Sequence, residues 1–176
     1  MERTGSQWVI GDPERHCGAH LKLTPEGIRP HAKGAQQELI PWSRFMELSL
    51  FVTARRWSSS RTVGALNDFL GSESGEDGID SHGSCLRGML RHPYEHWTGR
   101  FSHHERRYRT SEILLVDELV RQLTKAQATE QLGNADWLDQ AVTRLAPERP
   151  GTPSGARRLV SRLLEADFKT AGVPSA

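Results

Sequence analysis

The stretch Ser111–Leu132, SEILLVDELVRQLTKAQATEQL, carries the strongest structural signal in the chain. Its apolar residues recur at spacings of three and four, which places them on one face of a helix. They are Ile113, Val116, Leu119, Val120, Leu123 and Ala126, with Leu115 at the edge of the stripe. The opposite face carries Asp117, Glu118, Arg121 and Lys125. We therefore predict one long helix over 111–132 whose apolar face is covered by the rest of the chain or, as the alternative, by a partner.

Two shorter helices are predicted after this stretch. Asn134 can cap a helix over 135–145, which has its own apolar stripe. A linker rich in Pro and Gly follows at 146–155, APERPGTPSG. The third helix, 156–168, carries Leu159, Val160, Leu163 and Leu164 on one face, and it packs either on its own chain or on another.

The first half of the chain has the two-residue period of β-strands. Leu21 and Leu23 precede the turn Thr24–Gly27, TPEG, in which Pro presets φ and Gly accepts a positive φ. The segment Phe45–Thr53 alternates over nine residues, with Met46, Leu48, Leu50 and Val52 on one side. We therefore predict an α+β fold. A small N-terminal antiparallel β unit, within 1–109, packs against a helical part, 110–176.

Residues 21–48 resemble the opening strands of bacterial PH-like domains. The resemblance rests on LTPEGI at 23–28, on IPWSRF at 40–45 and on Leu48. It implies a bent, partly open β-barrel closed by a C-terminal helix, and a role in binding rather than catalysis. The chain departs from the family after Val52, where the sequence is poor in regular strands. The polar loop 71–83, GSESGEDGIDSHG, would be an insertion.

The segment 85–109, CLRGMLRHPYEHWTGRFSHHERRYR, has the most unusual composition. Arginines greatly outnumber acids in it, and aromatic residues stand between them. His92-Pro93 is typical of a helix start, so we predict a short helix over 94–101. Arginine binds carboxylates and phosphates through paired hydrogen bonds, which makes this segment the candidate binding surface. The candidate residues of this segment are Arg91, Trp97, Arg100, Arg106, Arg107 and Arg109. Arg55 and Arg56, from an earlier basic turn, would extend the surface if the fold brings them near.

The charge and hydropathy of the sequence argue against a strongly basic nucleic-acid-binding protein and against a membrane-spanning one. Lys+Arg is 23 and Asp+Glu is 22, so the formal net charge of +1 gives no overall attraction to nucleic acid or anionic membranes. The longest strictly apolar run, Ile113–Val116, is far shorter than a membrane span. No signal-peptide pattern opens the sequence, so we expect a cytoplasmic protein. Of the 23 basic residues only 4 are Lys, which is typical of GC-rich genomes such as those of actinobacteria.

One motif has a spacing that points to chemistry. His92, Glu95 and His96 spell H-x-x-E-H, which in inverted zinc peptidases places two imidazoles one turn apart on a helix. The alternative is therefore a small zinc-dependent hydrolase. Its third ligand is not evident, because Glu165, the one Glu of the last helix, lies on a solvated face. The paired Cys spacing of structural zinc sites is missing, and no common nucleotide-binding or serine-hydrolase motif occurs.

The sequence favours a non-catalytic cytoplasmic binding or adaptor protein. It would contact a protein partner or an anionic ligand through the arginine-rich segment, with no catalytic residue, metal or cofactor. A nucleic-acid-binding regulator is a further alternative, with 135–145 as the recognition helix. Asp136 and Asp139 on that helix oppose phosphate binding, so nucleic acid is not the expected partner.

Overall fold

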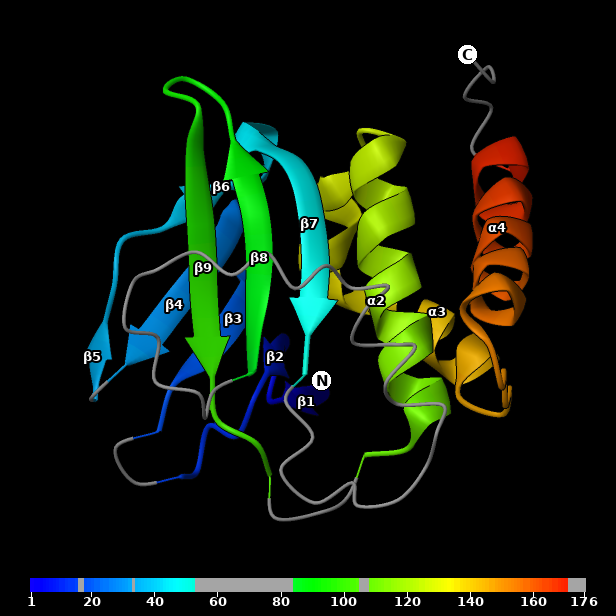
Figure 1. The fold of residues 1–176 in the computed structure, drawn as a ribbon, viewed down its shortest axis with the longest axis horizontal. Helices are drawn as coiled ribbons and strands as arrows, with labels where there is room; N and C mark the ends of the chain where they lie inside the picture. The colour runs from blue at the N-terminus through cyan, green and yellow to red at the C-terminus, as the bar shows by residue number, and fades with distance from the viewer. Residues whose placement is uncertain (16–17, 33, 53–83, 105–107, 171–176) are drawn as a thin grey trace.

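The fold is α+β, as predicted: two antiparallel sheets are followed by helices (Figure 1). The computed structural model of the 176-residue chain describes residues 1–15, 18–32, 34–52, 84–104 and 108–170. The predicted loop 71–83 lies outside these ranges. In Figure 1 the sheets stand on one side of the molecule, α2 (Thr110–Lys125) lies beside them, and α4 (Pro153–Thr170) lies beyond α2.

The first sheet is built by the N-terminal strands. They run in the order β1–β2–β3–β4–β5, and β6 also pairs with β4. The predicted hairpin is confirmed as β3 and β4. The strand bounds are β1 Glu2–Thr4, β2 Gln7–Ile10, β3 His20–Thr24, β4 Gly27–Ala32, β5 Ala35–Gln36 and β6 Ile40–Pro41.

The turn between β3 and β4 needs glycine for a reason other than the predicted one. Gly27 does not have a positive φ. A Cβ at this position would overlap the carbonyl oxygen of Ile40, so glycine permits the close approach of β6. Thr24 Oγ1 closes the turn, accepting from Gly27 N at 3.2 Å and donating to Gly27 O at 2.9 Å.

The second sheet contains β7 (Phe45–Phe51), β8 (Ser84–Leu90) and β9 (Glu95–Phe101), in that order. A short 3₁₀ helix, η1 (Trp42–Arg44), leads into it. An irregularity between Phe45 and Glu47 leaves Met46 42% exposed, so Met46 does not share the buried face of Leu48 and Leu50 as predicted.

The predicted helix over 94–101 is wrong, because this segment is strand β9. Trp97, Gly99 and Phe101 alternate with exposed residues and face the first sheet. Gly99 marks the contact between the sheets, since a Cβ there would lie 2.9 Å from Leu21 Cδ2. Trp97 packs edge-on against Phe45 with ring centroids 5.2 Å apart. The segment predicted to be helical therefore contributes Trp97 and Phe101 to the core as strand residues.

The helical part begins with α2, which ends earlier than predicted. The prediction of one helix over 111–132 is wrong beyond Lys125, because Gln127 has a φ of 54° and interrupts the helix. The chain continues as a 3₁₀ helix, η2 (Thr129–Gly133), which carries Leu132 into the core. α3 (Ala135–Leu145) has the predicted bounds, and α4 starts three residues before the predicted helix.

Helix α2 is covered on two sides, by β7 and by α4. Leu119 and Leu123 are buried as predicted. Asp117 and Glu118 are also buried, although the periodicity placed them on the solvated face, and Ala126 is exposed rather than covered. A helix between two neighbours needs more than one buried face, and polar groups on the second face must then find partners within the protein.

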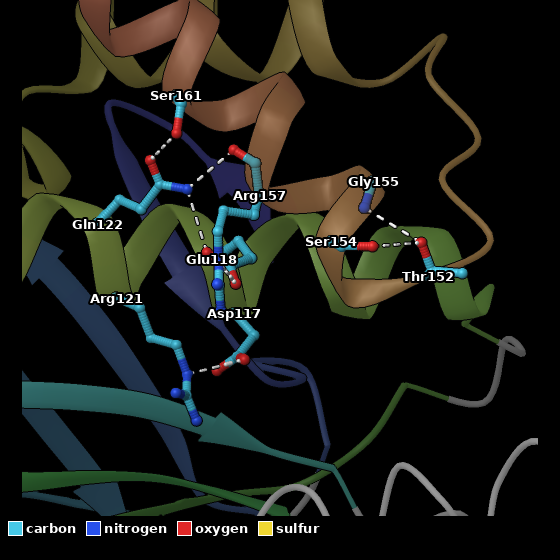
Figure 2. A network of polar contacts seen from close by, with 9 residues as sticks. All are labelled: Asp117, Glu118, Arg121, Gln122, Thr152, Ser154, Gly155, Arg157 and Ser161. Carbon is cyan, nitrogen blue, oxygen red and sulfur yellow. Dashed lines mark hydrogen bonds and ion pairs between the residues drawn. The ribbon is translucent and has the colours of Figure 1, made fainter.

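Both buried acids have such partners. Asp117 Oδ1 accepts from the backbone N–H of Leu50 in β7 at 2.8 Å. Asp117 Oδ2 lies 3.0 Å from Arg121 Nε, a contact that Figure 2 shows. Burial raises the pKa of Asp117 above its usual value, while the Leu50 N–H and Arg121 oppose this rise. The carboxylate thus binds the edge of β7 that faces away from β8. Within the described residues, β9 forms the other edge of this sheet.

The second buried acid joins α2 to α4. Glu118 accepts from Gln122 Nε2 at 3.1 Å and lies 3.4 Å from Arg157 Nε. Gln122 also accepts from Ser161 Oγ at 3.0 Å. Val160 of α4 has no exposed surface, so α4 packs on its own chain. This decides between the two uses of the last helix that the sequence left open.

Candidate functional site

The four predicted binding residues that the structure describes do not form one patch. Arg55, Arg56, Arg106 and Arg107 lie outside the described residues. Trp97 is part of the packing between the sheets. Arg91 directly follows β8, whereas Arg100 pairs with Cys85, six residues earlier on that strand. Strands rise about 3.3 Å per residue, so the two arginines lie about 20 Å apart. Arg109 is exposed and directly precedes α2.

The outer face of the second sheet brings two arginines together. Arg87 on β8 and Arg100 on β9 are both exposed, and the register places them on the face that points away from the first sheet. The Arg87 guanidinium lies 4.8 Å from the centroid of the Phe51 ring, a cation–π contact that restrains it. We call Arg87, His96, Thr98 and Arg100 the basic hairpin face. Arg87 was missing from the predicted set. The register pairs Cys85 with Arg100 and Arg87 with Thr98, so Arg87 and Arg100 are diagonal neighbours on one face.

A separate apolar cleft of about 300 Å³ lies where α2 leaves the sheets. It is lined by the ends of β2, β7 and β9, by the first half of α2 and by the end of α3. Ile113 and Val116 line it and are only partly buried, so the predicted apolar stripe of α2 is incompletely covered here. Tyr108, Glu112, Glu148 and Arg149 are the hydrogen-bonding and charged residues of the lining.

Three of these polar residues already have partners within the chain. Glu112 Oε2 accepts from the backbone N–H of Arg109 at 3.3 Å, at the start of α2. Arg149 Nη1 donates to the carbonyl oxygens of Ala146 and Glu148, the latter at 3.1 Å. The Tyr108 hydroxyl accepts from the backbone N–H of His104 at 3.2 Å. The cleft therefore presents mainly apolar surface to a ligand.

The H-x-x-E-H motif does not lie on a helix. His92 is in the turn between β8 and β9 with a φ of 57°, followed by a cis peptide bond to Pro93, and Glu95 and His96 are neighbours in β9. Neighbouring strand residues point to opposite faces. Glu95 pairs with Arg44 at 2.8 Å. In the part of the chain that the structure describes, no three His, Cys, Asp or Glu side chains are grouped for a metal ion.

Ser84 and His103 form a pair of the residue types used in nucleophilic catalysis. Ser84 Oγ lies 2.5 Å from His103 Nε2. Burial lowers the pKa of His103, with smaller effects of Arg15 and His104 in the same direction. Ser84, however, has no exposed surface. A substrate has no access to this hydroxyl, so we assign the pair a structural role at the start of β8.

Two histidines are stacked across β3 and β4. The rings of His20 and His31 have centroids 4.6 Å apart and are nearly parallel, at 10°. Burial lowers the pKa of both imidazoles, and the positive charge of Lys22 lowers it further. Both rings are therefore neutral in the folded protein at pH 7, and their protonation is disfavoured by the fold.

We expect the stability of the protein to fall as the pH is lowered below about 6.5. The lowered pKa of His20, His31 and His103 means that the unfolded chain binds protons at a higher pH than the folded chain. Stability then rises with pH across this window and is lost below it. Urea unfolding at pH 7.5, 6.5 and 5.5 measures the effect.

A pair of variants isolates the stacked histidines. The double variant His20→Gln/His31→Gln removes two of the three groups and should show a smaller loss between pH 7.5 and 5.5 than the wild type. His96→Gln, at an exposed position of β9, should keep the wild-type loss. Equal pH dependence in all three proteins would contradict the assignment.

Comparisons with known proteins returned no match: no family model fits the sequence, and neither a curated protein nor a solved structure is similar to the chain. Among the helices that the structure describes, none is both long and apolar enough to cross a membrane.

Proposed function

We propose that the chain is a non-catalytic binding or adaptor protein that contacts an acidic protein partner through the basic hairpin face. The observation that carries this proposal is the contrast between its arginines. Five described arginines have a carboxylate partner: Arg3, Arg44, Arg121, Arg144 and Arg157. Arg87 and Arg100 are exposed and have no carboxylate partner among the described residues, as is also true of Arg158 and Arg162 in α4. The two hairpin arginines differ because they share one face of paired strands, where Phe51 contacts Arg87.

The strands hold these two arginines in a fixed arrangement. Arg87 is restrained by Phe51, and the ladder between β8 and β9 is regular along its whole length. A guanidinium binds a carboxylate through two parallel hydrogen bonds, and less conformational entropy is lost when it is already positioned. Glu47, toward one end of β7, is the one described acid that the register places on this face. The surface therefore favours an acidic partner segment.

Co-purification with tagged protein tests this proposal. Arg87→Glu/Arg100→Glu should lose the partners that the wild type retains, because two charges become repulsive and affinity falls about tenfold or more. Arg158→Glu/Arg162→Glu is the matched control. It makes the same charge change at two exposed positions of α4, and its partners should be retained. Retention of every partner by the hairpin variant would refute the proposal.

The relation to PH-like domains also remains a proposal. It is supported by the order of the elements, since two antiparallel sheets precede a helix that packs on the second sheet. The residues that carry the resemblance occupy the turn between β3 and β4, strand β6 and the start of β7. The binding role that the family implies agrees with the proposed function.

Neither alternative function is supported by a specific observation. The hydrolase needs His92 and His96 on one helix, and these residues lie in a turn and a strand. The nucleic-acid regulator needs a free recognition helix at 135–145. In α3, however, Asp139 Oδ1 accepts from Trp8 Nε1 at 2.8 Å, and Asp139 also pairs with Arg3, so this side of α3 packs on the β1–β2 hairpin.

A further inference from the structure

Among the described residues, the apolar cleft brings together part of the apolar surface that the core does not cover. Five partly buried hydrophobic residues pack against the core and line this one cleft: Met1, Val52, Ile113, Val116 and Val142. Scattered apolar residues on a protein surface need no explanation, but a concave group of them marks a ligand-binding site. The volume of about 300 Å³ is at the lower end of the range for small-molecule sites.

The charges at the cleft indicate what kind of ligand fits. Glu148 and Arg149 have opposite charges and are neighbours in the chain. Glu112 adds a further negative charge, and its carboxylate already accepts from the start of α2. An anionic head group would meet a net negative lining, and its desolvation would not be offset by a free cation. An anionic ligand is therefore disfavoured, and the mainly apolar lining favours an uncharged one.

We propose that this cleft binds an uncharged small molecule of largely hydrocarbon or aromatic character. The contacts would be made by the partly buried side chains of α2 and α3 and by the end of β7, without a specific ion pair. Burial of their apolar surface drives binding, at about 25 cal/mol per Å² of area removed from water. The cleft is separate from the basic hairpin face, so the two proposals can fail independently.

An uncharged fluorescent dye, N-phenyl-1-naphthylamine, tests the cleft in the full-length protein. We expect a saturable rise in fluorescence with one dye bound per chain. Val116→Phe places a larger side chain in the cleft and should weaken dye binding about tenfold, the change expected from losing about 60 Å² of apolar contact. Val142→Phe, which adds a ring to the cleft from α3, should have the same effect and is used if the first variant does not fold.

Two comparisons make the test decisive. Ala126→Phe adds the same ring at an exposed position beyond the end of α2 and should leave dye affinity unchanged. The anionic dye 8-anilinonaphthalene-1-sulfonate should bind at least about tenfold more weakly than the uncharged dye, since the lining carries a net negative charge. Equal binding of both dyes, or unchanged affinity in both cleft-filling variants, would overturn the proposal.

Discussion

Replacing Gly133 by alanine is expected to destabilise the protein by about 3 kcal/mol or more. Gly133 ends η2 and lies directly against the turn between β3 and β4. A Cβ at this position would overlap the carbonyl oxygen of Thr24 and would lie 2.8 Å from Trp42 Nε1. Trp42 Nε1 donates to that same carbonyl at 2.8 Å. The added methyl group therefore meets backbone on one side and a buried indole on the other, and neither can move freely.

Chemical denaturation measures this effect, because the midpoint falls when stability falls while the slope stays constant. Gly151→Ala is the control. No atom lies within 4 Å of a Cβ built at Gly151, so this variant should stay within about 0.5 kcal/mol of the wild type. If the two alanine variants unfold at the same denaturant concentration, the close approach of η2 to the turn is wrong.

Replacing Asp117 by alanine is expected to cost about 2 kcal/mol. The carboxylate is the acceptor for the Leu50 N–H, and a buried N–H that loses its partner costs about 1–3 kcal/mol. Leu50 is 5% exposed, so water does not readily replace the lost acceptor. The ion pair with Arg121 contributes less, because the Arg121 side chain is 40% exposed.

The variant Asp117→Asn separates the hydrogen bond from the charge. It keeps an acceptor oxygen, so it should lose less stability than Asp117→Ala. The raised pKa of Asp117 means that the folded carboxyl keeps its proton to a higher pH than the unfolded one. Its contribution to stability therefore declines as the pH rises above about 3.8, and this decline should be absent in the asparagine variant. Equal losses in both variants would contradict the role of the acceptor.

Local periodicity was sufficient to predict the helices but not their surroundings. The spacing of Leu119 and Leu123 identified α2, and the cap at Asn134 identified the start of α3, where Asn134 Oδ1 accepts from Trp137 N at 3.2 Å. The periodicity could not indicate that α2 has two neighbours, because packing on α4 depends on residues about forty positions later. Asp117 and Glu118 were consequently placed in solvent, although each binds a different neighbour.

Residues 94–101 were predicted incorrectly as a helix because the helix-start pattern was weighted above the two-residue alternation of a strand. His92-Pro93 is typical of a helix start, and this pattern hid the alternation of Trp97, Gly99 and Phe101. With the strand assignment, Arg87 and Arg100 fall on one face, and Trp97 falls on the opposite, partly buried face. The apolar cleft could not be predicted, since its lining comes from five separate elements that only the tertiary fold brings together.

The two edge strands of the second sheet, β7 and β9, differ in whether another element covers their free side. The free side of β7 is occupied by α2, and Asp117 takes up the Leu50 N–H there. Among the described residues, β9 has a strand neighbour on one side only. Two chains that joined through β9 would form one continuous sheet with a helix at each end. In such a pair, α2 of each chain would cover the free side of β7, so the described part of the second sheet would not extend further by strand pairing.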